Sequence, residues 1–204
     1  MKADDNGEAF FTYMNTARKN DPIQTYFVLE KSSVDYKRLK TIGNVVSYHS
    51  TKHKILSLLC DKKISSQADE YVYNRFFDLS FLYGDIQHKQ KFVFLQHGVT
   101  INDSSMWLKK TDTNISLFVT AAQPEYQSIL DYAYGYEEKQ ITCTGFPRYD
   151  YLSASSHKKK EITFMPTWRQ YLTCDFDDKT DARKLKKGFS DSAYCSMYRQ
   201  VFSN

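Results

Sequence analysis

The sequence has few of the residues that interrupt or cross-link a chain. Only 7 glycines and 4 prolines occur among its 204 residues, which argues against a disordered or low-complexity protein. Its cysteines, Cys60, Cys143, Cys174 and Cys195, are widely scattered and form no CxxC pair or other metal-ligand spacing. We therefore expect reduced thiols, as in a cytosolic protein, and no metal site built from cysteine.

Long apolar runs and a strong charge of one sign are also absent. No run of about 20 apolar residues occurs, so no transmembrane helix is expected. The polar and acidic start, from Met1 to Asn6, is unlike a signal peptide. The 28 Lys and Arg against 24 Asp and Glu give a net charge of +4, which permits an anionic partner but lacks the dense basic stripe of a DNA-binding domain. We expect a protein on the cytoplasmic side with no nucleic-acid partner.

The residues that are present alternate between helix-type and strand-type segments, in a chain long enough for one or two domains. Runs rich in aromatic and β-branched residues predict strands over residues 25–30, 44–48, 62–67, 91–96, 115–122 and 140–145. Helices are predicted over residues 7–16, 34–40, 50–60 and 124–134, where Asp5 or Asn6 suits the start of the first and Pro124 the start of the last. This alternation predicts an α/β fold with a Rossmann-like, mainly parallel sheet between about Tyr26 and Asp150.

A polar stretch over residues 153–160 reads as a linker. We therefore predict two domains, over residues 1–155 and 156–204. The second is expected to open with a strand near Glu161, to continue as loop plus helix over residues 175–187, and to end in a helix.

Polar clusters follow three of the predicted strands. They are His97-Gly98, the turn from Gly145 to Asp150, and the segment from Pro166 to Arg169. Because parallel sheets bind ligands at the carboxyl ends of their strands, these clusters are the candidate site. From spacing alone, His97 is either a structural histidine or a general base, and Arg148 either a surface ion-pair partner or an anion ligand.

Four motifs resemble, in order, the CDP-glycerol glycerophosphotransferase family of teichoic acid synthesis. They read KFVFLQHGVT, LFVTAAQPEY, TGFPRYD and FMPTWRQYL, and the segments ADDNGEAFF and ISSQADEY are similar to further family segments. The resemblance implies a GT-B type architecture of two Rossmann-like domains with the active site in the cleft between them. It makes the first domain the acceptor side and the second, of which only the beginning is present, the nucleotide-binding domain. It implies transfer of glycerol phosphate from CDP-glycerol to a hydroxyl of a lipid-linked acceptor, with release of CMP, by a peripheral protein at the cytoplasmic face of the membrane.

The resemblance also assigns roles to single residues. His97 is the expected base, since histidine in general exchanges protons near neutral pH. The expected substrate-binding residues are Gln96, Gly98, Val99, Thr100, Arg148, Pro166, Thr167, Arg169, Asp5 and Asn6. No cofactor and no metal is expected. Asp150 is a candidate to orient Arg148, which can grip phosphate oxygens with its forked guanidinium.

Other polar residues have weaker assignments. Asp4, Asp5 and Glu8 suit helix capping and substrate hydroxyl contacts better than a metal. Ser65, Ser66 and Asp69 form either an acceptor contact or a turn. The remaining histidines lie in polar stretches and are expected to be solvated: His49, His53, His88 and His157, the last in a run of three lysines that suits an anionic membrane surface.

Two departures from the family pattern leave other functions open. The chain starts almost on the acidic ADDNGE segment, where family members have a preceding strand, and it lacks counterparts of the family's later nucleotide-binding motifs. The sequence therefore suggests an internal fragment, and we expect little transferase activity from these residues alone. A non-catalytic interaction module and a sugar-nucleotide glycosyltransferase of the same fold are the alternatives.

Overall fold

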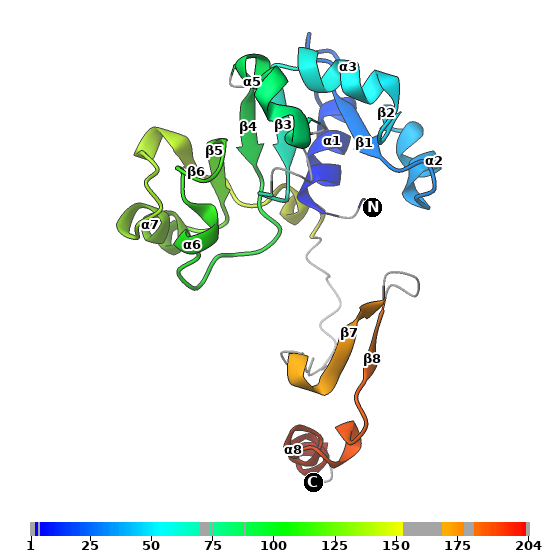
Figure 1. The fold of residues 1–204 in the computed structure, drawn as a ribbon, viewed down its shortest axis with the longest axis vertical. Helices are drawn as coiled ribbons and strands as arrows, with labels where there is room; N and C mark the ends of the chain where they lie inside the picture. The colour runs from blue at the N-terminus through cyan, green and yellow to red at the C-terminus, as the bar shows by residue number, and fades with distance from the viewer. Residues whose placement is uncertain are drawn as a thin grey trace. The chain divides into compact units, whose positions relative to one another are not determined.

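A computed structural model describes residues 3, 5–69, 74, 76–87, 89–152, 169–177 and 182–202. The chain divides into two compact units, Met1–Ala154 and Ser155–Asn204. The described helices and strands of the first unit are α1 (Asn6–Thr16), β1 (Tyr26–Leu29), α2 (Asp35–Lys40), β2 (Asn44–Ser47), α3 (Thr51–Leu59), β3 (Lys62–Ser65), η1 (Phe77–Leu79), α5 (Ser80–Gln87), β4 (Lys91–Phe94), α6 (Ser105–Leu108), β5 (Ile115–Thr120), α7 (Gln123–Asp131), η2 (Glu138–Gln140), β6 (Ile141–Cys143) and η3 (Pro147–Tyr151). It is an α/β unit, as predicted (Figure 1).

The strands of the first unit form two parallel sheets. Strands β1 and β2 pair with each other, and the second sheet has the order β3-β4-β5-β6 with every pair parallel. The predicted continuous sheet from Tyr26 to Asp150 is therefore wrong in one respect, because hydrogen bonding divides it after β2. Helix α1 contacts both β1 and β3, so it lies against both sheets (Figure 1).

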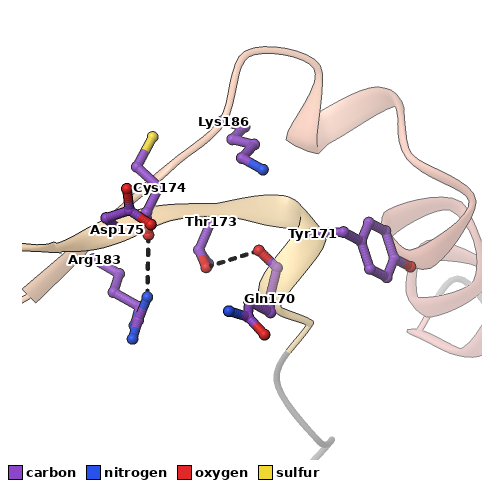
Figure 2. A pocket seen from close by; sticks show the side chains of 7 residues that line it. All are labelled: Gln170, Tyr171, Thr173, Cys174, Asp175, Arg183 and Lys186. Atoms are coloured by element: carbon purple, nitrogen blue, oxygen red, sulfur yellow. Dashed lines mark hydrogen bonds between the residues drawn. The ribbon is translucent and has the colours of Figure 1, made fainter.

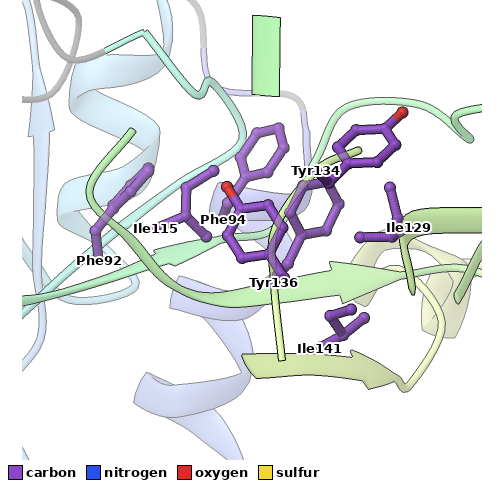
Figure 3. Packing of buried hydrophobic residues seen from close by; sticks show 8 residues of the cluster. Phe92, Phe94, Ile115, Ile129, Tyr134, Tyr136 and Ile141 are labelled. Carbon is purple, nitrogen blue, oxygen red and sulfur yellow. The ribbon is translucent and has the colours of Figure 1, made fainter. Parts of the chain in front are cut away.

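The four-stranded sheet is held by an aromatic core. Phe118 of β5 is fully buried, with its ring centroid 5.1 Å from that of Phe94 and 5.4 Å from that of Tyr136, both in edge-to-face geometry. Ile129 of α7 and Ile141 of β6 close the same cluster (Figure 3). The apolar run around Phe94 thus forms a strand because both of its faces meet apolar side chains, as in parallel sheets generally.

Local signals in the sequence account for most of the helix ends. Asp5 is the N-cap of α1, and Ser50 caps α3 by accepting a hydrogen bond from the backbone N–H of His53. Pro124 occupies the first turn of α7, where its missing N–H leaves no hydrogen bond unmade. Gly145 takes a φ of 77°, and this left-handed turn lets the chain pass from β6 into η3.

The second unit differs from its prediction. Its described elements are η4 (Gln170–Leu172), β7 (Thr173–Asp177), β8 (Ala182–Leu185), η5 (Phe189–Asp191) and α8 (Ala193–Phe202). Strands β7 and β8 pair antiparallel, so the loop plus helix predicted over residues 175–187 is wrong. The C-terminal helix is confirmed as α8. The linker over residues 153–160, with its histidine and lysines, and the strand predicted near Glu161 lie outside the described residues.

Several smaller points of the sequence analysis can be compared with the structure. Helices α5 and α6 were not predicted. All four cysteines are free thiols, as expected. His53 was expected to be solvated but is buried, and its Nδ1 accepts a hydrogen bond from the backbone N–H of His49 at 3.2 Å. Among the described helices, none is long and apolar enough to cross a bilayer.

Candidate functional site

The first turn of α1 meets the segments that follow β3, β4 and β6. Asn6 makes the central connection and is fully buried. Its Nδ2 donates to the carbonyl oxygens of Leu95 at 3.3 Å and Gln96 at 2.6 Å, and its Oδ1 accepts from the backbone N–H of Arg148 at 3.3 Å. The N–H of Gly7 donates to Ser66 Oγ at 3.2 Å. One helix start therefore ties together three strand ends that are far apart in the sequence.

His97 lies just past the carboxyl end of β4, and its side chain is exposed. Its Nδ1 is 3.2 Å from the backbone carbonyl oxygen of Ser66. Since a carbonyl oxygen only accepts, this contact places the ring proton on Nδ1 and leaves the lone pair of a neutral imidazole on Nε2. No residue in the described part of the chain hydrogen-bonds to Nε2. The ring is thus held from one side while its other nitrogen is open to a ligand.

Arg148, at the start of η3, lies beside His97. Its Nη1 donates to the backbone carbonyl oxygen of His97 at 2.9 Å and forms an ion pair with Asp5 Oδ1. Its guanidinium also lies over the rings of Phe146 and Tyr149, 5.3 Å and 5.9 Å from their centroids. The carboxylate that orients Arg148 is therefore that of Asp5, and the suggestion that Asp150 does so is corrected. Within the described residues, Nε and Nη2 of Arg148 have no hydrogen-bond partner.

Gln96 and Thr100, predicted substrate ligands, hydrogen-bond instead to the protein. Gln96 is 2% exposed, its Nε2 donates to the carbonyl oxygen of Val119 at 2.7 Å, and its Oε1 accepts from Thr100 Oγ1 at 2.9 Å. Both residues also donate to the buried carboxylate of Glu125 in α7. Gln96 and Asn6 are buried and Thr100 is half-buried, so these residues support the site from within. Their assignment to substrate binding stays a prediction.

Two other residues of this loop, Gly98 and Val99, lie next to open space. A Cβ placed on Gly98 would have no atom within 4 Å, and Val99 is 44% exposed. Space is therefore open beside His97, next to Gly98 and Val99, which are predicted to bind substrate. Asp5, His97 and Arg148 are among the described residues that present polar groups at this edge.

The structure thus brings together Asp5, Asn6, Gln96, His97, Gly98, Val99, Thr100 and Arg148, all predicted from the sequence. Pro166 and Thr167 lie outside the described residues. Arg169 belongs to the second unit, where its guanidinium stacks 5.6 Å from the ring centroid of Tyr194. The assignment of these three to substrate binding stays a prediction. Glu125 was missed, although its position after Pro124 in the first turn of a helix was visible.

The acidic start of α1 carries no metal centre in its described part. Glu8 forms an ion pair with Arg38, whose Nη2 is 2.9 Å from Glu8 Oε2 and 2.8 Å from Asp35 Oδ1. The hydrogen bonds to Glu8 and then Asp35 raise the pKa of Arg38 above its ordinary value. Nowhere in the described ranges do three His, Cys, Asp or Glu side chains gather as a metal would need. Asp4 lies outside those ranges.

The second unit has an open pocket on its hairpin that the sequence did not indicate (Figure 2). Its lining residues are polar and of mixed charge: Gln170, Tyr171, Thr173, Cys174, Asp175, Arg183 and Lys186. Arg183 Nη1 donates to the carbonyl oxygen of Cys174 at 3.4 Å, and Thr173 Oγ1 to that of Gln170 at 3.3 Å (Figure 2). No histidine is among the described residues that line this pocket, and the candidate catalytic centre remains the edge of the first unit, where the predicted residues meet.

Comparison with known proteins agrees with the motifs. Residues 1–197 match the family described as CDP-Glycerol:Poly(glycerophosphate) glycerophosphotransferase. The chain is 42% identical over 203 residues to the "Minor teichoic acid biosynthesis protein GgaB" of Bacillus subtilis (strain 168), covering 100% of this chain and 22% of that protein's length. No solved structure matches. The match over nearly the whole chain, together with the order of its motifs, shows that the chain belongs to the CDP-glycerol:poly(glycerophosphate) glycerophosphotransferase family.

Proposed function

We propose that this chain contributes the proton-accepting centre of a transferase that moves glycerol phosphate from CDP-glycerol to an acceptor hydroxyl. The acceptor we propose is a lipid-linked, teichoic-acid-type chain at the cytoplasmic face of the membrane, where the protein would act as a peripheral enzyme of GT-B type. Family membership and the relative's role in teichoic acid biosynthesis support the donor and the pathway.

The observation that carries the proposal is the orientation of His97. Phosphoryl transfer depends mainly on positioning and charge stabilisation, and it needs a group to receive the proton of the attacking hydroxyl. His97 is exposed, and the lone pair of its Nε2 is available because Nδ1 is held by the carbonyl of Ser66. An acceptor hydroxyl beside Gly98 would give its proton to Nε2 as its oxygen bonds to the β-phosphorus of CDP-glycerol. The bond from that phosphorus to the bridging oxygen breaks, and CMP leaves with that oxygen.

Arg148 is the proposed contact for the diphosphate. Its Nε and Nη2 carry N–H donors that have no partner among the described residues, and these donors are available to phosphate oxygens. Donors of this kind stabilise the charge that spreads over the phosphoryl oxygens. The bond from Arg148 Nη1 to the His97 carbonyl keeps the cation and the base adjacent, so a phosphate held by one lies near the other.

Two substitutions of His97 test the proposal in the intact protein. His97→Ala removes both ring nitrogens, whereas His97→Asn retains an Nδ2 donor for Ser66 and removes only the group at the position of Nε2. CMP release from CDP-glycerol should fall by ~10²-fold or more in both variants, because general-base contributions are of that size. Near-normal release from His97→Asn would remove His97 from the proton transfer. Nucleotide release from a UDP-sugar, with none from CDP-glycerol, would overturn the donor.

A further inference from the structure

A buried acidic residue lies behind the proposed base, and neither the motifs nor the family match gives it a role. Glu125 is 3% exposed and sits in the first turn of α7. We infer that Glu125 is a positioning residue: its carboxylate fixes the loop of residues 96–100 in the conformation that presents His97. The expected effect of Glu125 on turnover rests on the proposed function, whereas its expected effect on the conformation of the loop rests on the geometry alone.

The carboxylate of Glu125 is fully engaged by N–H donors. Oε2 accepts from the backbone N–H of Ala121 at 2.6 Å, and Oε1 accepts from the backbone N–H of Thr100 at 2.6 Å and from Gln96 Nε2 at 3.2 Å. A buried carboxylate without such partners is strongly unfavourable. The start of a helix also favours a negative charge. Glu125 therefore joins three pieces of chain: the end of β5, the start of α7, and the loop after β4.

The loop that it holds has an unusual backbone. Gln96 has a φ of 57°, a left-handed conformation that residues other than glycine rarely adopt. Such a conformation persists when the surroundings over-determine it, and it occurs often at functional sites. Here the Gln96 side chain is bound by Val119, Thr100 and Glu125, and its backbone carbonyl by Asn6. Glu125 contacts both ends of the turn, Gln96 and Thr100, so it closes the loop around His97.

The direction of the His97 side chain follows from this turn. His97 is the residue directly after Gln96, so any relaxation of the left-handed φ rotates the imidazole away from the Ser66 carbonyl, now 3.2 Å from Nδ1. A misplacement of about 1 Å can lower turnover by 10²-fold even when the changed residue is remote from the chemistry. Glu125 would thus affect the rate of transfer through His97 without touching substrate.

Glu125→Gln is the central variant. The glutamine amide would direct an N–H donor at the N–H of Ala121 or of Thr100, so one contact becomes a clash of donors. We expect kcat for CMP release to fall about tenfold or more, with KM for CDP-glycerol within about threefold. Asp131→Asn is the matched control, since it removes one negative charge from the exposed end of the same helix, where the contact is Gln127 Nε2 at 2.9 Å. It should keep the wild-type kcat.

Three measurements separate positioning from a general loss of structure. Amide hydrogen exchange at Thr100 and Ala121 should accelerate in Glu125→Gln and not in Asp131→Asn. In Glu125→Gln, the nitrogen chemical shifts of the His97 ring should also lose the pattern of a ring with its proton on Nδ1. In a His97→Ala background, Glu125→Gln should cause no further loss of kcat. If Glu125→Gln does not fold, Glu125→Asp, which retains both acceptor oxygens on a shorter side chain, should fold and lower kcat.

The outcomes distinguish the two hypotheses. If the intact wild-type protein, tested as in the His97 experiment, releases no CMP from CDP-glycerol, the proposed function is overturned. Amide exchange and the chemical shifts of the His97 ring then decide the role of Glu125. Wild-type kcat in Glu125→Gln or in a folded Glu125→Asp, unchanged exchange at Thr100, or an equal further loss in the His97→Ala background would each overturn the positioning role.

Discussion

At the residue scale, the role of each polar side chain follows from which of its atoms remain without a partner. Asn6 is buried, and both polar atoms of its side chain hydrogen-bond to the protein. His97 has one ring nitrogen in a hydrogen bond and one without a partner among the described residues. Arg148 lies between these two cases. Both of its hydrogen bonds, to Asp5 and to the His97 carbonyl, use Nη1 of a guanidinium that has five N–H donors. Asn6 can therefore only shape the site, whereas His97 and Arg148 can act on a ligand.

Arg148→Ala should weaken binding of CDP-glycerol by about 1.5–3 kcal/mol, the range for a hydrogen bond that involves a charged group. Arg18→Ala is the matched control, since Arg18 also pairs with a carboxylate, that of Asp21 at 2.7 Å, but lies beyond the other end of α1. Calorimetric titration of CDP-glycerol into the wild type and both variants measures the difference. Equal affinities for wild type and Arg148→Ala would contradict the assignment of Arg148 to the diphosphate.

Tyr136 provides a test of burial in the core. Removal from water raises the pKa of Tyr136 to about 12, against a smaller opposite effect of its hydrogen bond with Thr113 Oγ1 at 2.8 Å. Because the unfolded chain loses this proton near pH 10, the free energy of unfolding should fall as pH rises from about 10 to 12. The stabilisation is fully present below that window. The difference in absorbance at 295 nm between wild type and Tyr136→Phe should titrate near pH 12, and titration near pH 10 would show an exposed phenol.

At the scale of elements, the carboxyl ends of parallel strands and the start of α1 build the site. The strand ends were predictable, because apolar runs that stop at His97-Gly98 and at Gly145 are visible in the sequence. Contacts between distant elements were not. Whether Asn6 is exposed depends on where α1 docks, and Glu125 gains its role from a loop that ends 25 residues earlier in the chain, at Thr100.

The elements that were missed or mistaken share a physical cause. Helix α5 has the sequence SFLYGDIQ, with a central glycine and with Phe81 and Leu82 exposed, so its apolar residues do not follow a helical period. The region of β7 and β8 is dense in charge, which suggested a loop and a helix, but the two strands pair with each other through their backbones. In both cases pairing or packing overrides the local pattern.

Gly43, between α2 and β2, tests how closely α1 packs on its sheet. A Cβ at Gly43 would lie 2.5 Å from Asn15 Oδ1 and 2.8 Å from Cζ of the buried Phe11. Asn15 is held by hydrogen bonds to Phe11 and Thr25, both 2.8 Å, so it cannot move freely. Gly43→Ala should therefore lower the free energy of unfolding by about 1–3 kcal/mol, as overpacking does.

Gly98→Ala is the matched control for this substitution. Its added methyl group would meet no atom within 4 Å, so the free energy of unfolding should change by about 0.5 kcal/mol or less. Urea unfolding of both variants measures the difference. Similar losses of stability at the two positions would mean that α1 does not pack against Gly43 as described.

At the scale of the whole molecule, the apolar core belongs to the first unit. Each hydrophobic cluster of the described residues draws all its members from residues before 154. Among the residues of the second unit whose burial the structure describes, Leu172 is the only buried hydrophobic one. The sequence predicted a boundary at residue 155, within a polar stretch, from composition alone. The nature of the second unit as a nucleotide-binding domain stays a prediction.

The distribution of the core predicts that residues 1–154 fold on their own. A segment of this length is within the usual size of a domain, and it contains the whole four-stranded sheet with its buried aromatic cluster. Residues 1–154 should therefore unfold in urea in one cooperative transition and give a dispersed amide spectrum. Residues 1–87 are the control, because that segment lacks β4, β5 and β6 and so loses Phe94, Phe118 and Ile141 from the cluster. It should show no cooperative transition. A gradual, non-cooperative loss of structure in residues 1–154 would mean that the fold of the first unit depends on chain beyond its own core.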